Sequence, residues 1–185
     1  MRLTLIGLVL VGVIAPLPNT WRVAQGDVRV ICPMTIGGSF EATTTALSGA
    51  LTPPATGASA LNGSVTVDLR TLDTGISLRN AHLRDKYLEV DKEPGFETAT
   101  LSEIDLQGFD AGTSEGKWSF SGLLTLHGVR KPVTGTFEVR AHADGLRVKA
   151  SFPVELPAYG IDKPRYLGIG VKDVVRVEAA FAVTH

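Results

Sequence analysis

Strict alternation of apolar and polar residues is the dominant pattern along the chain. Successive side chains of a β-strand point to opposite faces, so each alternating stretch predicts a strand with one buried face and one solvent face. Five such stretches stand out, with apolar members Val65, Val67 and Leu69; Trp118, Phe120, Leu124 and Leu126; Val133, Phe137, Val139 and Ala141; Leu146, Val148, Ala150, Phe152 and Val154; and Val175, Val177, Ala179, Phe181 and Val183. The pattern predicts an all-β protein with an antiparallel sheet.

Turn residues separate these stretches. Asn62-Gly63 precedes the strand that contains Val65, and this dipeptide predicts a two-residue hairpin because both positions tolerate positive φ. Ala143-Asp144-Gly145 predicts a second hairpin. Weaker strands at 21–32 and 38–51 bring the expected number to about eight, which is typical of a sandwich or a barrel.

One stretch between Asp73 and Pro94 has helical spacing instead. It predicts a short helix of about three turns that begins at an Asp73 or Thr74 cap and closes one end of the β-structure. The residues at helical spacing are Ile76, Asn80, Leu83 and Tyr87. The charged residues expected to face water are Arg79, Arg84, Asp85 and Lys86.

Length, net charge and cysteine content limit the number of domains and the kinds of ligand that the chain can bind. The chain has 185 residues, a length typical of one domain, and no internal repeat is visible. Eighteen Lys and Arg against 19 Asp and Glu give a net charge of −1, which offers no electrostatic footprint for nucleic acid. A single cysteine excludes an intramolecular disulfide and any multi-cysteine metal site. Neither a monomer nor a homodimer is favoured by these features.

The N-terminus has the layout of a secretory signal. Arg2 is followed by an apolar run over 3–14, which is too short for a membrane-spanning helix of about 20 residues. The alternative is a buried first strand or helix, and Pro16 disfavours cleavage at the best small-residue site. We expect residues 1–20 to be a secretion signal and residues 21–185 to form one domain.

Two patterns in the sequence suggest catalysis or metal binding, and each also has a structural interpretation. Residues 112–116 match G-x-S-x-G, but a strand follows where a serine hydrolase needs a helix, so we expect a hairpin loop there. His82, Asp85 and Glu89 lie on adjoining turns of the predicted helix, yet no partner ligand from another element is recognisable. We therefore expect no catalytic residues, no metal and no cofactor.

Two further side chains have structural rather than chemical interpretations. His127 ends an alternating strand, where a ring nitrogen commonly bonds turn backbone. Cys32 stands between Ile31 and Pro33 and is expected to act as a small buried hydrophobe.

Several segments together resemble the YceI-like family. The most specific are two. One is the strand-to-helix segment, in which Val65-Thr66-Val67-Asp68 leads to Leu72-Asp73-Thr74-Gly75 and then to Arg79-Asn80-Ala81-His82-Leu83-Arg84. The other is Leu124-Thr125-Leu126-His127-Gly128-Val129, and the resemblance runs from Trp21 to Val183. It implies a lipocalin-like antiparallel barrel, export from the cytoplasm, and an apolar pore that holds a polyisoprenoid, an isoprenoid quinone or a fatty-acid-like lipid. The chain departs from the family pattern at 30–33, 87–90 and 93–96, close to the expected barrel mouth.

The resemblance implies lipid binding for transport or storage in the periplasm or outside the cell, and it implies no enzyme activity. From the alternation, and for the helix from the resemblance, the expected ligand-binding residues are Trp118, Phe120, Leu124, Leu126, Phe137, Val148, Ala150, Phe152, Leu83 and Tyr87. Small inward residues such as Gly122, Gly135, Ala150 and Ala179 either leave a channel or form the small half of a close-packed core. A solid core would instead indicate an extracytoplasmic protein-interaction module.

Overall fold

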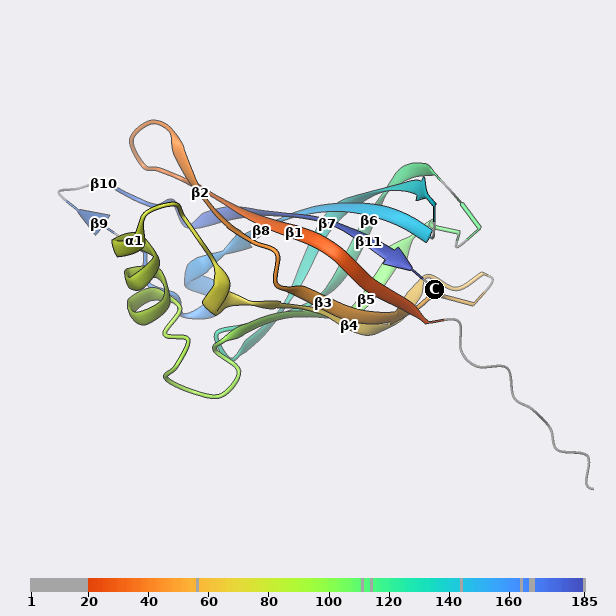
Figure 1. Ribbon diagram of the computed structural model, residues 1–185, viewed down its shortest axis with the longest axis horizontal. Helices are drawn as coiled ribbons and strands as arrows, with labels where there is room; N and C mark the ends of the chain where they lie inside the picture. The colour runs from red at the N-terminus through yellow and green to blue at the C-terminus, as the bar shows by residue number, and fades with distance from the viewer. Residues whose placement is uncertain are drawn as a thin grey trace, which may run out of the picture.

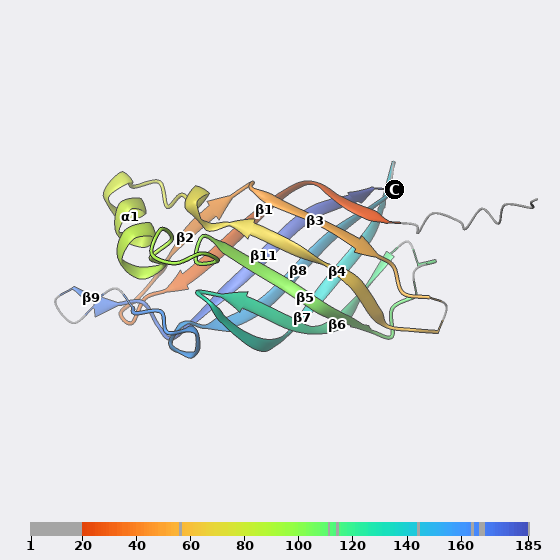
Figure 2. The ribbon, with the colours of Figure 1, turned by 90° about the horizontal axis from the view of Figure 1, so that it is seen from below.

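A closed antiparallel barrel forms the body of the molecule (Figures 1 and 2). The computed structural model describes residues 20–55, 57–110, 112–113, 115–143, 145–163, 165–166 and 169–184. The wall strands are β1 (Trp21–Pro33), β2 (Ser39–Thr44), β3 (Leu47–Thr52), β4 (Ala60–Asp68), β5 (Thr98–Gln107), β6 (Glu115–Leu126), β7 (Val129–His142), β8 (Gly145–Glu155) and β11 (Val174–Thr184). A small hairpin of β9 (Arg165–Tyr166) and β10 (Ile169–Gly170) lies outside the wall.

Eight strand positions make up the ring, as the alternation predicts. Consecutive strands pair with each other from β3 to β8, β8 pairs with β11, and β11 pairs with β1 to close the ring. β2 and β3 share one position beside β1, because β2 pairs with its second half and β3 with Trp21 and Arg22 at its start. The fold class inferred from the sequence is confirmed.

A short helical segment covers one end of the barrel (Figure 2). Helix α1 (Ser77–His82) continues into the π-helical turn η2 (Leu83–Tyr87), which gives the length predicted between β4 and β5. The predicted cap is wrong, because Ile76 occupies the N-cap position without a side-chain bond. Across the part of the chain that the structure describes, no helix is long and apolar enough to span a membrane.

The predicted cap residues serve a different purpose. The Asp73 carboxylate accepts a hydrogen bond of 2.6 Å from the Asn80 amide, and the Asn80 carbonyl oxygen accepts one of 2.8 Å from the Thr74 backbone N–H. Asp73 also forms a β-bridge with Thr43 of β2. These bonds tie the helical segment to the barrel wall rather than satisfying the helix terminus.

The hairpin predicted at Asn62-Gly63 is also wrong. Both residues lie inside β4, opposite Thr52 and Leu51 of β3, and β4 has a bulge against β5 at this point. Gly63 has φ +114°, and an ideal Cβ there would lie 2.1 Å from the Ala50 carbonyl oxygen. The positive φ of Gly63 therefore belongs to a β-bulge rather than to a hairpin turn. A bulge bends a strand without reversing its direction.

A histidine joins three loops at the helical end. His127 and Gly128, with φ +51° and +72°, form the β6–β7 turn. The His127 ring lies 3.1 Å from the Tyr159 carbonyl oxygen through Nδ1 and 3.2 Å from the Glu89 carboxylate through Nε2. Tyr159 ends the turn η3 (Leu156–Tyr159) and Glu89 follows η2, so the backbone bond predicted for His127 is confirmed and Glu89 is added to it.

The inward glycines are filled by their neighbours. An ideal Cβ on Gly135 of β7 would lie 2.7 Å from the Phe120 ring, 2.8 Å from Phe152 Cβ and 2.4 Å from the Ser151 carbonyl oxygen. Gly122 is buried, and a Cβ there would lie 3.1 Å from Leu101 Cδ1. These two glycines admit side chains from adjacent strands and belong to the close-packed part of the interior.

We expect Gly135→Ala to destabilise the barrel. The added methyl must displace backbone as well as two aromatic side chains, and overpacking typically costs about 1–3 kcal/mol. Gly112→Ala is the matched control, because the nearest atom to a Cβ there is Asp110 Oδ1 at 3.6 Å. The measurement is urea unfolding of both variants, and equal free energies of unfolding would contradict the packing described here.

Candidate functional site

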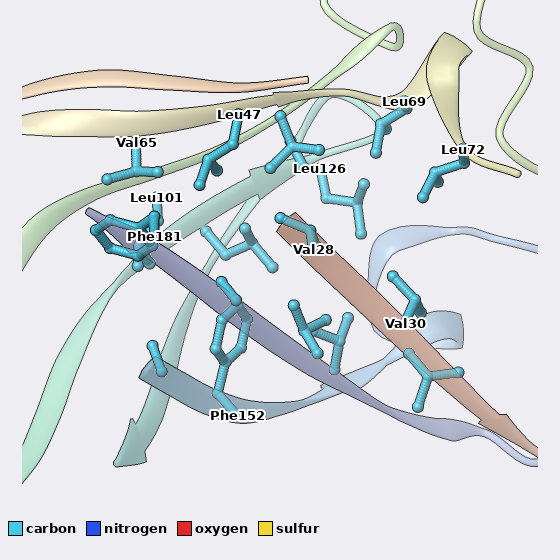
Figure 3. A pocket seen from close by; sticks show the side chains of 18 of the residues that line it. Val28, Val30, Leu47, Val65, Leu69, Leu72, Leu101, Leu126, Phe152 and Phe181 are labelled. Carbon is cyan, nitrogen blue, oxygen red and sulfur yellow. The ribbon is translucent and has the colours of Figure 1, made fainter. Parts of the chain in front are cut away.

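The barrel encloses a cavity of about 240 Å³. A water molecule needs only about 10–15 Å³ on this measure, so the space is far larger than a packing defect. Figure 3 shows side chains from facing strands pointing toward one another across it, among them Val28 of β1, Val65 of β4 and Phe152 of β8. The cavity is therefore built by the inner faces of the strands that the alternation identifies.

Hydrocarbon forms nearly all of the cavity wall. Among the described lining residues, the side chains that carry a heteroatom are those of Trp21, Cys32, Tyr87 and Asp162. Asp162 is solvent-exposed and so marks the rim rather than the interior. A wall of this chemistry offers an apolar molecule contact without requiring any polar group to lose hydration.

The cavity reaches the surface at the helical end. At the end opposite the helix, Trp21, Leu51 and Val139 retain only 7%, 4% and 2% of their accessible surface, while Leu146 is partly exposed. At the helical end, five lining residues are partly or fully exposed: Cys32, Phe40, Leu83, Tyr87 and Asp162. We call these five residues the mouth, since access to the interior runs past them.

Alanines in the middle of the wall show that the interior is hollow. Ala150 of β8 and Ala179 of β11 lie opposite each other in the register, and both line the cavity. They remain only partly buried although they face inward, as do Val148 and Val177. Unlike the two glycines, these residues are among those that line the cavity.

Nine of the ten residues expected from the sequence line this cavity. They are Phe120, Leu124, Leu126, Phe137, Val148, Ala150, Phe152, Leu83 and Tyr87. Trp118 is not among the lining residues; its ring stacks on Phe137 at 5.7 Å and meets Phe109 edge-on at 5.2 Å. Trp118 therefore supports the wall from outside the cavity.

The sequence-based set omits the first half of the barrel. Val28, Val30 and Cys32 of β1 line the cavity, as do Phe40 of β2 and Val65 of β4. In β1, the inward-facing residues 28, 30 and 32 have the period-2 spacing of a strand. The polar residues elsewhere in β1 make this alternation less clear than in the later strands. Cys32, expected to be a buried hydrophobe, is half-buried at the mouth.

Two of the four charged helix residues do not face open water as expected. The Arg79 guanidinium lies 4.6 Å from the centroid of the Phe40 ring, and Arg84 donates a 2.8 Å hydrogen bond to the Arg70 carbonyl oxygen. Both arginines are half-buried, whereas Asp85 and Lys86 are exposed. Desolvation raises the pKa of the Cys32 thiol to about 11, and the nearby Arg79 charge opposes this rise.

The residues considered for a metal form no three-ligand cluster within the described part of the chain. Of the three residues considered for a metal, His82 and Asp85 are exposed, while Glu89 bonds Lys92 at 2.8 Å and His127 at 3.2 Å. These bonds, chiefly the one from Lys92, lower the pKa of the Glu89 carboxyl. The G-x-S-x-G match falls in the β5–β6 connection, and its Ser114 lies outside the described residues.

The family model for the YceI-like domain matches residues 21–183, the whole extent of the barrel. The chain belongs to the YceI-like family. A search of curated proteins finds no match.

Solved structures share this YceI-like fold. A polyisoprenoid binding domain from Saccharophagus degradans aligns with a TM-score of 0.66 at 18% identity, covering 89% of this chain and 97% of the other. BcnA from Burkholderia cenocepacia aligns at 0.68 and 19%, covering 86% and 96%. A Campylobacter jejuni YceI protein aligns at 0.52 and 14%, covering 98% and 94%. At these identities the likeness establishes the fold.

The three segments that the sequence analysis sets apart from the family pattern, 30–33, 87–90 and 93–96, lie at the helical end of the barrel. Cys32 and Tyr87 line the cavity there. Glu89 and Phe96 both contact the His127 ring, Phe96 with a centroid separation of 4.0 Å.

We expect the Cys32 thiol to react slowly while the barrel is folded. With a pKa near 11 instead of 9.0, its thiolate fraction at pH 8 falls on the order of 100-fold below that of the unfolded chain. The check is the iodoacetamide rate in buffer and in urea, from pH 7 to 10. The folded rate should still be rising at pH 10, where the unfolded rate levels off. Equal rates in the two states would contradict the desolvated position.

Proposed function

We propose that this YceI-like barrel binds one long apolar or amphiphilic lipid in its cavity and carries or stores it outside the cytoplasm. The observation that carries the proposal is the hollow, hydrocarbon-walled interior that opens at the helical end. Similarity to a polyisoprenoid binding domain supports an isoprenoid chain as the ligand class.

The chemistry of the wall is sufficient for such a ligand. Each methylene transferred from water into the cavity contributes about 0.8 kcal/mol. Ordering the chain and the loss of its free motion offset part of this gain, so a long tail is needed for useful affinity. Because the attraction is non-directional, no charged residue inside the barrel is required.

Binding fits the structure better than catalysis. Cys32 is the lining residue closest to a nucleophile in character, and its raised pKa keeps the thiol protonated at neutral pH. The hollow at Ala150 and Ala179 also favours a ligand over the alternative of a protein-interaction module with a solid core.

Ala150→Trp tests the proposal. The indole would occupy space in the cavity, so the variant should fold with a stability close to that of delipidated wild type and carry no lipid. Lys149→Trp is the matched control, because Lys149 is the exposed neighbour on the same strand. The measurement is mass spectrometry of a solvent extract of each purified protein, together with thermal unfolding.

Wild type and Lys149→Trp should each yield about one lipid per chain. Wild-type protein that is lipid-free from several hosts and also fails to take up a polyprenol would overturn the proposal. Wild-type lipid occupancy in Ala150→Trp would show that this position is not on the ligand path. Severe destabilisation of that variant relative to delipidated wild type would indicate a solid core.

We also propose that the apolar run over residues 3–14 directs export. This segment lies outside the described residues, and the proposal rests on its charge and hydropathy pattern. Deleting residues 2–18 should retain the protein in the cytoplasm, whereas the full chain should appear in the periplasmic or secreted fraction. Immunoblotting of fractionated cells measures both, and full-length protein found only in the cytoplasm would refute it.

A further inference from the structure

One arginine at the mouth has no partner within the described residues. Of the arginines near the helical end, Arg29, Arg70 and Arg130 form ion pairs, and Arg84 donates to a backbone carbonyl. The guanidinium of Arg79 forms neither kind of bond, although the residue is half-buried. A partly desolvated cation with five N–H donors and no acceptor is costly, because the lost hydration is not replaced.

Arg79 lies beside residues that line the cavity. Its guanidinium lies 4.6 Å from the Phe40 ring centroid, and its charge lowers the pKa of the Cys32 thiol against the effect of burial. Phe40 and Cys32 are both mouth residues that line the cavity. The guanidinium therefore stands at the point where the apolar wall meets water.

The surroundings leave the donors of Arg79 available. The aromatic face of Phe40 contacts the cation, a contact that does not consume N–H donors. Asp73, the acidic group at the base of the helix, is occupied by Asn80 and the Gly75 backbone N–H. Asp162, the charged residue among those that line the cavity, is solvent-exposed. Within the described residues, no hydrogen-bond acceptor for the Arg79 guanidinium is present, so its donors are open to a ligand.

We propose that Arg79 binds the oxyanion head group, carboxylate or phosphate, of an amphiphile whose tail occupies the cavity. This rests on the proposed function and adds the head-group class to it. Guanidinium groups donate in parallel to two oxygens of such a group, which gives direction as well as attraction. The hydrocarbon wall then supplies affinity for the tail, and Arg79 discriminates between head groups.

The experiment compares two probes with the same tail, geranylgeraniol and geranylgeranyl phosphate. Delipidated wild-type protein should bind the phosphate at least tenfold more tightly than the alcohol, measured by calorimetry. Arg79→Gln should remove this preference while the Kd for the alcohol stays within about twofold. Arg84→Gln is the control, since it makes the same charge change on the same helix at an arginine that already has an acceptor.

Arg79→Met is a second variant that keeps an apolar stem over Phe40 and should behave like Arg79→Gln. An unchanged phosphate preference in both Arg79 variants would overturn the inference and leave the proposed function standing. Failure of wild type to bind either probe would instead overturn the proposed function. Inorganic phosphate alone should not compete for Arg79, and tight binding of it would show a simple anion site with no link to the cavity.

Discussion

Closure of the sheet between β1 and β11 is the constraint on which the rest of the structure depends. Their pairing runs from Arg22 opposite Thr184 to Ile31 opposite Arg176 and completes a ring of eight strand positions. A ring of this size has an interior that side chains just fill or that holds one small ligand. Closure fixes the width, so the size of the inward side chains decides between a solid and a hollow barrel.

Glycine and alanine have opposite effects on that interior. Gly135 lets Phe120 and Phe152 move into the space a side chain would take, so its lack of a Cβ increases packing. Ala150 and Ala179 are paired neighbours on β8 and β11 that line the cavity, and their short side chains extend less far into it than a larger residue would. A small residue creates a cavity only where no large neighbour on an adjacent strand can reach it.

The sequence predicts the wall better than the mouth. Period-2 alternation depends only on which face of a strand is buried, so it located residues such as Phe137 and Phe152 correctly. It cannot tell how far along the barrel a position lies, which is why Trp118 was expected at the cavity. Contacts between loops are invisible to it: Glu89 and His127 are 38 residues apart and meet only because the fold brings both to the helical end.

The division between an apolar wall and a polar rim has a physical consequence for ligand recognition. Apolar contact is proportional to area and insensitive to detail, so the wall tolerates exchange of one hydrocarbon side chain for another of similar volume. Polar recognition depends on direction, and the structure confines it to the rim, where Arg79, Cys32 and Asp162 meet water. Under the proposed function, a change at the rim would therefore alter which head group is accepted, while the wall would still bind the tail.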